Sequence, residues 1–504
     1  METEIKLDAA PSFRLPDLRG VAEGITTRKL ATLHQRAIYF DTPDLRLARN
    51  GITLRHRTET AGGKSNEAWT LKLPGNANGV AMVRQELNWP GTRDAPPPQA
   101  IGLVRATTRG AGLEPVATVE TERARVRLRD RAGLVMAEVD DDRVVVTGRD
   151  QRRRHFREIE VEAVEGTAPR ILDAVRARLR EAGAMDGSRR PKVFRALGPK
   201  AEEPDVAVPV IDHRATLRQV ISAAIAQGVT TLIRHDPGIR LGDDIEHVHK
   251  ARVATRRLRS DLRTFRPILD RDWANKTREE LKWAAAALGE VRDADVLLEE
   301  LRKQAAGLPE TDAAAAEAML GEVSGERNMA NERLLAVLDS DRYLVLLNEL
   351  AAAATDPPLD RSAFEPDAAA RSALPRLVRK PWKRLRETVR GLQDPPPDEG
   401  LHLVRKRAKA VRYAAEAAAP VIGKPAQKLA AAMENLQEVL GSLHDAVVAE
   451  AWLRRRGLAG DPAQALVAGQ LVERERQRQA VHRQAWPRAW EEAARKRLRA
   501  WIKG

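Results

Sequence analysis

The stretch METEIKL (1–7) decides the fold that we expect for the first part of the chain. Side chains of a β-strand point to opposite faces with a period of two residues. Glu2, Glu4 and Lys6 would therefore share one face, and Ile5 and Leu7 the other. One strand of this kind is typical of a solvated sheet edge, so the charged face matters only if other strands repeat it.

Six further segments between residues 51 and 163 repeat the alternation. Each segment has its charged residues on one face. In chain order, the first carries Arg55 and Arg57, the second Lys72, the third Arg84 and Glu86, the fourth Arg123, Arg125 and Arg127, the fifth Glu138 and Asp140, and the sixth Glu158, Glu160 and Glu162. Solvated faces usually mix in Ser, Thr and Gln, whereas these carry acids and bases. About eight antiparallel strands closed into a barrel would turn the charged faces inward. An open sheet with one wet face is the alternative.

Such a lining predicts a phosphate chemistry. Bases inside a barrel neutralise a polyanion, and clustered carboxylates need a divalent cation to offset their repulsion. Hard oxygen ligands favour Mg²⁺ or Mn²⁺. Bases that bind phosphate beside acids that bind metal are typical of phosphoryl-transfer sites. In these sites, positioning and charge stabilisation provide most of the catalysis.

The composition agrees with an anionic partner. The chain has 504 residues, and 86 Lys and Arg against 72 Asp and Glu give a formal charge of +14. This balance points to nucleic acid, polyphosphate or an anionic membrane. Aromatic residues make up only 4% of the chain, which disfavours stacking on single-stranded nucleic acid. The absence of cysteine excludes disulfides, thiolate zinc sites and cysteine nucleophiles.

The sequence also predicts a cytoplasmic location. Acids stand at positions 2 and 4, where a signal peptide would need bases. No stretch approaches the roughly 20 apolar residues of a membrane span, so we expect no membrane partner.

Several motifs in order resemble the CYTH family, the triphosphate tunnel metalloenzymes. The N-terminal ExExK pattern at residues 2–6 is followed by YFDTPDLRLARNGITLRHR (39–57), WTLK (69–72), VRQELN (83–88), EIEVE (158–162) and RPKVFRA (190–196). The resemblance covers about residues 1–197. It implies a tunnel fold and enzymes that include class IV adenylate cyclases, thiamine triphosphatases and inorganic triphosphatases.

The same resemblance implies roles for individual residues. The expected metal ligands are Glu2, Glu4, Asp140, Glu158 and Glu160, with the register among Glu158, Glu160 and Glu162 left open. The expected substrate-phosphate ligands are Lys6, Arg55, Arg57, Lys72, Arg84, Arg123 and Lys192, and Glu86 matches an acid near the metals. Glu4 and Lys6 are the expected catalytic residues, Lys6 as a general base. In the alternative, a carboxylate or the metal orients the water.

A Pro-rich linker (198–210) separates this part from a helical one with an internal repeat. HVHKARVATRRLRSDL (247–262) aligns with LHLVRKRAKAVRYAAE (401–416), and ALGEVRDADV (287–296) aligns with VLGSLHDAVV (439–448), 152–153 residues apart. In each repeat a histidine and three cations fall on one stripe of a helix, joined by a lysine on the next. The predicted polyphosphate ligands are His249, Arg252, Arg256, Arg259, Lys276, His402, Arg405, Lys409, Arg412 and Lys428. A solvated basic face is the alternative.

These stripes resemble the CHAD domain, the conserved histidine α-helical domain, over about residues 212–504. The resemblance implies binding of inorganic polyphosphate, and a CYTH domain followed by a CHAD domain implies an inorganic triphosphatase. The second repeat replaces one arginine by Lys409, which keeps the charge and loses bidentate geometry.

We therefore expect an α+β multidomain protein. Its predicted parts are an N-terminal antiparallel β-barrel at 1–197, a linker at 198–211, and a C-terminal all-α duplicated helical bundle at 212–504, with repeats at about 212–354 and 367–504. The expected function is metal-dependent hydrolysis of inorganic triphosphate together with polyphosphate binding, and association with polyphosphate granules is a further expectation. Nucleic acid is a disfavoured partner. The alternatives are a cyclase-like or thiamine or organic triphosphatase activity, and a non-catalytic polyphosphate-binding module.

Overall fold

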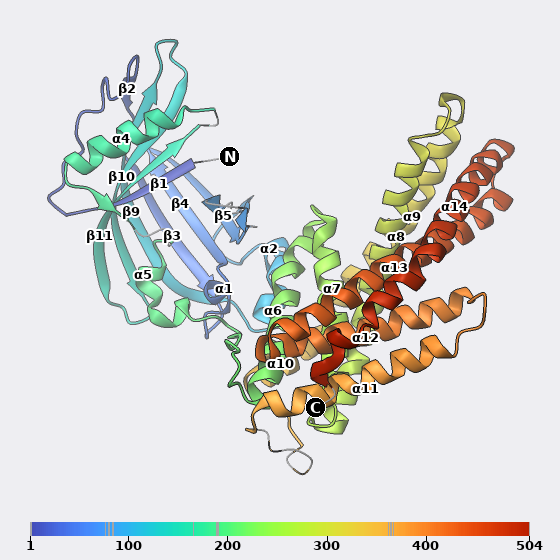
Figure 1. Cartoon of the computed structure of the whole chain (residues 1–504). Helices are drawn as coiled ribbons and strands as arrows, with labels where there is room; N and C mark the ends of the chain where they lie inside the picture. Colours follow the sequence, from blue (N-terminus) through green and yellow to red (C-terminus); the bar gives the residue numbers. More distant parts are fainter. Residues whose placement is uncertain are drawn as a thin grey trace. The chain divides into compact units, whose positions relative to one another are not determined.

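The computed structural model describes most of the chain, and the chain forms two compact units. The described residues are 3–75, 77–78, 81–82, 85–164, 166–187, 191–360, 362, 365 and 367–502. The first unit spans Met1–Asp205 and the second Val206–Gly504. Figure 1 shows the strands in the first unit and the long helices in the second.

The first unit is built on a ten-stranded antiparallel sheet. Its strands follow the order β12-β1-β11-β10-β9-β3-β4-β5-β8, and β2 pairs with β9. Their bounds are β1 Thr3–Ala9, β2 Thr26–Lys29, β3 Leu33–Asp41, β4 Thr53–Ala61, β5 Lys64–Leu73, β8 Gln85–Pro90, β9 Glu114–Arg129, β10 Val135–Gly148, β11 Arg153–Ala163 and β12 Met185–Asp186. The expected antiparallel sheet is confirmed. In the described part of the chain, the path of hydrogen-bonded strands runs from β12 to β8 without closing.

Short elements connect and flank these strands. A small hairpin pairs β6 (Ala77–Asn78) with β7 (Ala81–Met82). The helices are α1 Arg46–Arg49, α2 Pro98–Leu103, α3 Arg105–Thr108, α4 Pro169–Glu181, α5 Phe194–Leu197 and the 3₁₀ turn η1 Pro199–Glu202.

One face of the sheet is apolar and is covered by α4. Leu7, Leu128 and Ile159 come from three strands and are fully buried against Val175 and Leu179 of the helix. Figure 1 shows α4 lying across β10 and β1. Burying a side chain of this size contributes about 1.5–3 kcal/mol, so this layer fixes which face of each strand is left for the charged residues.

The opposite face of the sheet is charged at one end of the strands and apolar at the other. Toward the ends of β9 and β10 it carries Val119, Val144 and Val146, which pack against Val193 and Ala196 at α5. The alternation that predicts a charged face therefore holds for only part of each strand. Because α5 is anchored on this apolar end, the segment that precedes it is held over the charged end.

The second unit is helical and duplicated. The first repeat contains α6 Leu217–Leu241, α7 Ile245–Thr264, α8 Arg271–Ala305, the 3₁₀ turn η2 Glu310–Asp312, α9 Ala313–Leu338 and α10 Asp341–Thr355. The second contains α11 Ala370–Arg390, α12 Asp398–Ile422, α13 Lys424–Ala459, α14 Pro462–Ala493 and the 3₁₀ helix η3 Lys496–Ile502. The repeats also meet, because a backbone bridge joins Thr216 to Ala369, 153 residues further on. Among the helices of the described residues, none has both the length and the apolar composition that a membrane crossing requires.

Candidate functional site

The register of four strands gathers the charged residues into rows. Across β1, β11, β10 and β9, Lys6 stands opposite Glu160, which stands opposite Asp140 and then Arg125. The row beside it contains Glu4, Glu162, Glu138 and Arg127, and the row on the other side contains Asp8, Glu158, Asp142 and Arg123. Residues directly opposite each other share a face. Acids of the two central strands therefore lie between Lys6 on β1 and three arginines on β9.

Arg123 is the centre of this arrangement. Its guanidinium group contacts Asp140, binds Asp142 through two nitrogens at 2.8 and 2.7 Å, and binds Glu160 at 2.6 Å. The fully buried Asp142 also contacts Lys192, the residue that the apolar anchor of α5 holds in place.

The two lysines converge on Glu160. The Nζ atom of Lys6 lies 2.8 Å from Oε1 of Glu160 and 3.8 Å from Glu158, and the Nζ atom of Lys192 lies 3.3 Å from the same Oε1 of Glu160. An ammonium group held by two carboxylates is stabilised in its charged form. Lys6 is therefore held between two carboxylates of the cluster.

The carboxylates of this cluster differ in their affinity for protons. Burial raises the pKa of Asp140 to about 7, against the attraction of Arg123. Burial also raises the pKa of Glu158 to about 7, and the neighbouring Glu160 acts in the same direction. For Glu160, burial is outweighed by Lys192, Lys6 and Arg123, which hold its pKa well below the usual range. One carboxylate is thus firmly ionised and two titrate near neutral pH.

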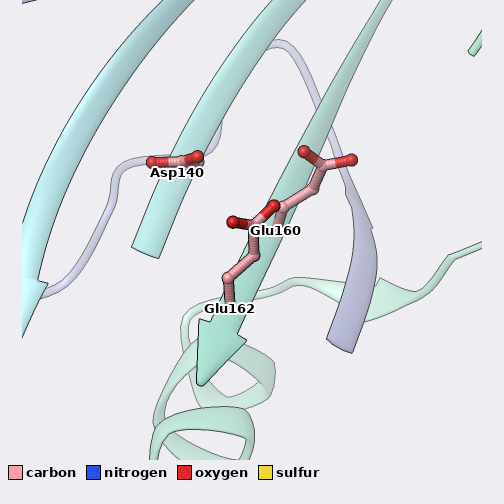
Figure 2. Close-up of side chains that lie close together, drawn as sticks. All are labelled: Asp140, Glu160 and Glu162. Carbon is pink, nitrogen blue, oxygen red and sulfur yellow. The ribbon is translucent and has the colours of Figure 1, made fainter. Parts of the chain in front are cut away.

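The cluster fits a hard divalent cation. Carboxylate oxygens of Asp140, Glu160 and Glu162 all lie within 4.8 Å of one another (Figure 2). The buried Oδ1 of Asp140 has no hydrogen-bond partner, and neither has the buried Oε1 of Glu158, which lies 3.8 Å from Nζ of Lys6. Buried carboxylate oxygens without a donor are costly unless a cation meets them. The donor set contains oxygen alone, which suits Mg²⁺ or Mn²⁺.

A second group of bases lies on the same face, on β4 and β5, beside an acid on β8. Lys72 binds Glu86 at 2.6 Å, Arg57 binds Glu59 at 2.9 Å, and Arg55 donates to the hydroxyl of Tyr39 at 3.3 Å. The register places Arg55 opposite Tyr39 and Arg57 opposite Ala37. Glu86, which we expected near a metal, pairs with a base of this group instead.

Not all expected site residues can be located. Glu2 and Arg84 lie outside the described residues, as does the side chain of Glu4, whose backbone pairs with Glu162. That register and the carboxylate distances group Glu162, more than Glu158, with Asp140 and Glu160. Sequence reasoning missed Asp142, although it continues the alternation of Glu138 and Asp140 by one further step.

In the helical unit, cations of the two repeats face one another. Burial and the neighbouring Arg256, Arg405 and Arg252 lower the pKa of Lys409 to about 7. Arg256 and Lys409 occupy equivalent positions of α7 and α12, so the two predicted stripes meet. The acids beside them are Asp293, 2.9 Å from Arg252, and its counterpart Asp445, which acts on Arg405 and Lys409.

The two predicted histidines also lie at equivalent places. The ring of His402 lies against that of His444 on α13, tilted by 35° with a centroid distance of 4.1 Å, and burial and His444 lower the pKa of His402 to about 4. In the first repeat, burial and Arg292, the counterpart of His444, lower the pKa of His249. Both histidines are therefore neutral at pH 7.

The remaining predicted ligands depart from a simple stripe. Arg412 binds Glu416 at 2.7 Å and Glu434 at 2.5 Å, and Lys276 binds Glu349 at 2.8 Å. Lys428 is exposed on α13. The pair of Arg412 with Glu416 is visible in the sequence as an i, i+4 pair, whereas Glu434 and Glu349 lie on other helices than the bases that they bind.

Fold and site together define a class of protein: a sheet whose charged face sets carboxylates among bases, followed by a basic, duplicated helical unit. The chain belongs to the CYTH family and carries a CHAD domain after its CYTH domain. The model of the CYTH domain matches residues 1–193, and that of the CHAD domain matches residues 223–454. CYTH proteins are metal-dependent enzymes that act on phosphoanhydrides, triphosphatases and cyclases among them.

Two relatives are similar to nearly the whole chain, and two solved structures are similar to parts of it. The uncharacterized proteins MT2285 and Rv2226, from two strains of Mycobacterium tuberculosis, are each 31% identical over 487 residues, which is 92% of this chain and 90% of theirs. The CHAD domain of the plant Ricinus communis is similar over 57% of this chain and 95% of its own, with 23% identity and a TM-score of 0.47. A putative adenylyl cyclase from Hippeastrum, described as having a dominant triphosphatase activity, is similar over 40% of this chain and 99% of its own, with 21% identity and a TM-score of 0.23.

Proposed function

We propose that the first unit hydrolyses inorganic triphosphate with the help of Mg²⁺ or Mn²⁺, and that the second unit binds inorganic polyphosphate. The observation that supports hydrolysis best is the row of Lys6, Glu160 and Asp140 with Arg123 across it. It offers cations for a phosphate chain beside acids that need a cation of their own.

In this proposal the acidic residues bind the metal and the basic residues bind the substrate. Asp140, Glu160 and Glu162 hold the divalent cation, which supplies charge neutralisation for the phosphoanhydride. Lys6, Lys192 and Arg123 bind the phosphates at the carboxylate cluster, and Arg55, Arg57 and Lys72 bind the extended end of the substrate. The negative charge of bound phosphates would replace part of the carboxylate charge that now balances these bases.

We assign the general base to Glu158 rather than to Lys6. A carboxylate with a pKa of about 7 can accept a proton from water at neutral pH, whereas Lys6 is committed to its ion pairs with Glu160 and Glu158. Glu158→Gln should lower kcat with little effect on KM and leave an acidic limb set by Asp140 alone, whose pKa is also about 7. An unchanged kcat would assign proton transfer to another group.

A substrate panel tests hydrolysis. Tripolyphosphate, ATP and thiamine triphosphate are incubated with the full chain and Mg²⁺ or Mn²⁺, and released phosphate and pyrophosphate are measured separately. We expect phosphate from tripolyphosphate to be the fastest product. Pyrophosphate released from ATP would instead identify a cyclase, fastest turnover of thiamine triphosphate an organic triphosphatase, and no turnover with any metal a binding module.

The proposal for the second unit rests on the facing stripes of α7 and α12. Burial and the nearby Arg256, Arg405 and Arg252 lower the pKa of Lys409, and a bound polyanion would relieve the repulsion among these four bases. Binding of long-chain polyphosphate by the full chain should weaken steeply with salt, because a linear polyanion releases counterions when bases neutralise it. Double-stranded DNA is the competitor to include, and we expect polyphosphate to displace it.

A further inference from the structure

The two repeats of the helical unit differ in charge at equivalent ends of their basic helices. On α7, Arg252, Arg256, Arg259 and Arg263 fall within an arc of about 60°, and the row extends for about 16 Å along the axis. On α12 the equivalent positions are Arg405, Lys409, Arg412 and Glu416. The last position is therefore a base in the first repeat and an acid in the second.

The end that belongs to the second repeat is neutralised internally. Glu416 binds Arg412 at 2.7 Å and also Arg257 at 3.0 Å, and Glu434 on α13 binds Arg412 at 2.5 Å. Each base at this end already has a carboxylate, so a phosphate group would have to displace it.

The end that belongs to the first repeat carries a surplus of bases, which we call the arginine cluster: Arg259, Arg263, Arg278, Arg384 and Arg407. Partial burial and Arg278, Arg407, Arg259 and Arg384 lower the pKa of Arg263. Burial and Arg278 lower the pKa of Arg259, and Glu279, the acid that acts on it, is itself bound to Lys282 at 3.2 Å.

Several donors of this cluster have no acceptor. The Nε atoms of Arg259, Arg278 and Arg407 are buried and form no hydrogen bond. Sequence alone gives Arg278 no special place, because its counterpart in the second repeat is Ala430. Unpaired buried guanidinium donors from three helices form a site for an anion with several oxygens, since a guanidinium group binds phosphate through two parallel hydrogen bonds.

We propose that the arginine cluster is a second phosphate-binding site, continuous with the facing stripes, which a polyphosphate chain reaches only if it is long enough to extend along α7. This proposal rests on polyphosphate binding by the helical unit and adds chain-length selectivity to it. Short chains occupy the stripes alone, whereas long chains occupy the stripes and the arginine cluster. Extension in the other direction meets Glu416 and Glu434, which repel it.

The test gives the first repeat the residues of the second. The double variant Arg263→Glu with Arg278→Ala is compared with Arg302→Ala with Lys303→Glu, which makes the same change in net charge at two exposed residues near the far end of α8. Binding of pentapolyphosphate and of long-chain polyphosphate to the full chain is measured at several salt concentrations. We expect the first variant to bind the long chain about tenfold less tightly than the control does, with a shallower salt dependence. Its affinity for pentapolyphosphate should match that of the control.

Equal affinities of variant and control for the long chain would overturn the proposal, as would an equal loss for both chain lengths. Glu434→Gln provides a gain that misfolding cannot produce: removal of one of the two carboxylates that bind Arg412 should tighten long-chain binding. An unchanged or weaker affinity also counts against the proposal. If the unaltered protein binds no polyphosphate, the proposal that the helical unit binds polyphosphate is refuted before any variant is made. The proposal of a second site is then refuted as well.

Discussion

Binding of polyphosphate should be coupled to the uptake of a proton by Lys409. Burial and three surrounding arginines lower its pKa to about 7, while Asp445 opposes them only in part. A bound phosphate chain brings negative charge to the ammonium group and raises the pKa again, so a lysine that is neutral in the free protein binds a proton in the complex.

The size of the effect follows from that pKa. At pH 8.5 a group with a pKa of about 7 is charged in only about 3% of molecules. Between the free and the bound pKa, one such group reduces affinity by up to about tenfold per pH unit. Because half of the molecules are charged at pH 7, affinity for long-chain polyphosphate should therefore fall by as much as about sixteenfold from pH 7 to pH 8.5, with the full effect requiring a bound pKa well above 8.5.

Calorimetry in two buffers of different ionisation enthalpy measures the uptake directly. At pH 8 we expect close to one proton per bound site in the unaltered protein. His402, with a pKa of about 4, is neutral at that pH in the free protein, so it does not obscure the result. The control is Lys409→Arg, which restores the residue of the first repeat, Arg256, and stays charged throughout. Equal proton uptake by the two proteins, or none by the unaltered one, would refute the reasoning.

Three further predictions concern the first unit. Asp140→Asn should raise the metal concentration needed for half-maximal phosphate release by about 10–100-fold, because it removes a buried carboxylate ligand. Glu122→Gln, at an exposed position of β9, is the control, and equal metal titrations of the two variants would place the ion elsewhere. Arg55→Ala and Arg57→Ala should each raise KM for tripolyphosphate and the double variant more so, whereas Arg36→Ala on the opposite face of β3 should not; unchanged kinetics of the double variant would remove β4 from the site. Leu128→Ala should lower the free energy of unfolding by about 2–5 kcal/mol in urea titrations, against less than about 0.5 kcal/mol for the exposed Leu134→Ala; similar losses would mean that Leu128 does not belong to the packed layer.

Much of the fold could be predicted because a period of two is a local property. The alternation in METEIKL and its repeats fixes which residues share a face, and the family resemblance fixes the order of the strands. The change of face along β9 and β10 could not be predicted in this way. Val144 has the same parity as Asp140 and Asp142, and only the packing of α5 makes its position apolar.

The types of residue in the site could be predicted from the sequence, but which acid lies beside which base could be predicted less well. Lys6, Arg123 and Lys192 were expected to hold phosphate, and they surround a single carboxylate, Glu160. The neighbours of each acid depend on the strand register, and a slip of two residues would change each opposite pair while leaving every side chain on its face. The grouping of Glu162 with Asp140 therefore required the three-dimensional structure.

The bridge between Thr216 and Ala369 has a consequence for how the helical unit could have diversified. A position that pairs with its own counterpart is the geometry of an isologous dimer, in which every substitution appears on both sides of the axis. Joining the two copies in one chain removes that restriction, so Arg263 and Glu416 are free to differ. Linear polyphosphate has identical ends and no direction of its own. A tethered, unequal pair of repeats can assign it one, so that chain ends are distinguished by the protein and not by the polymer.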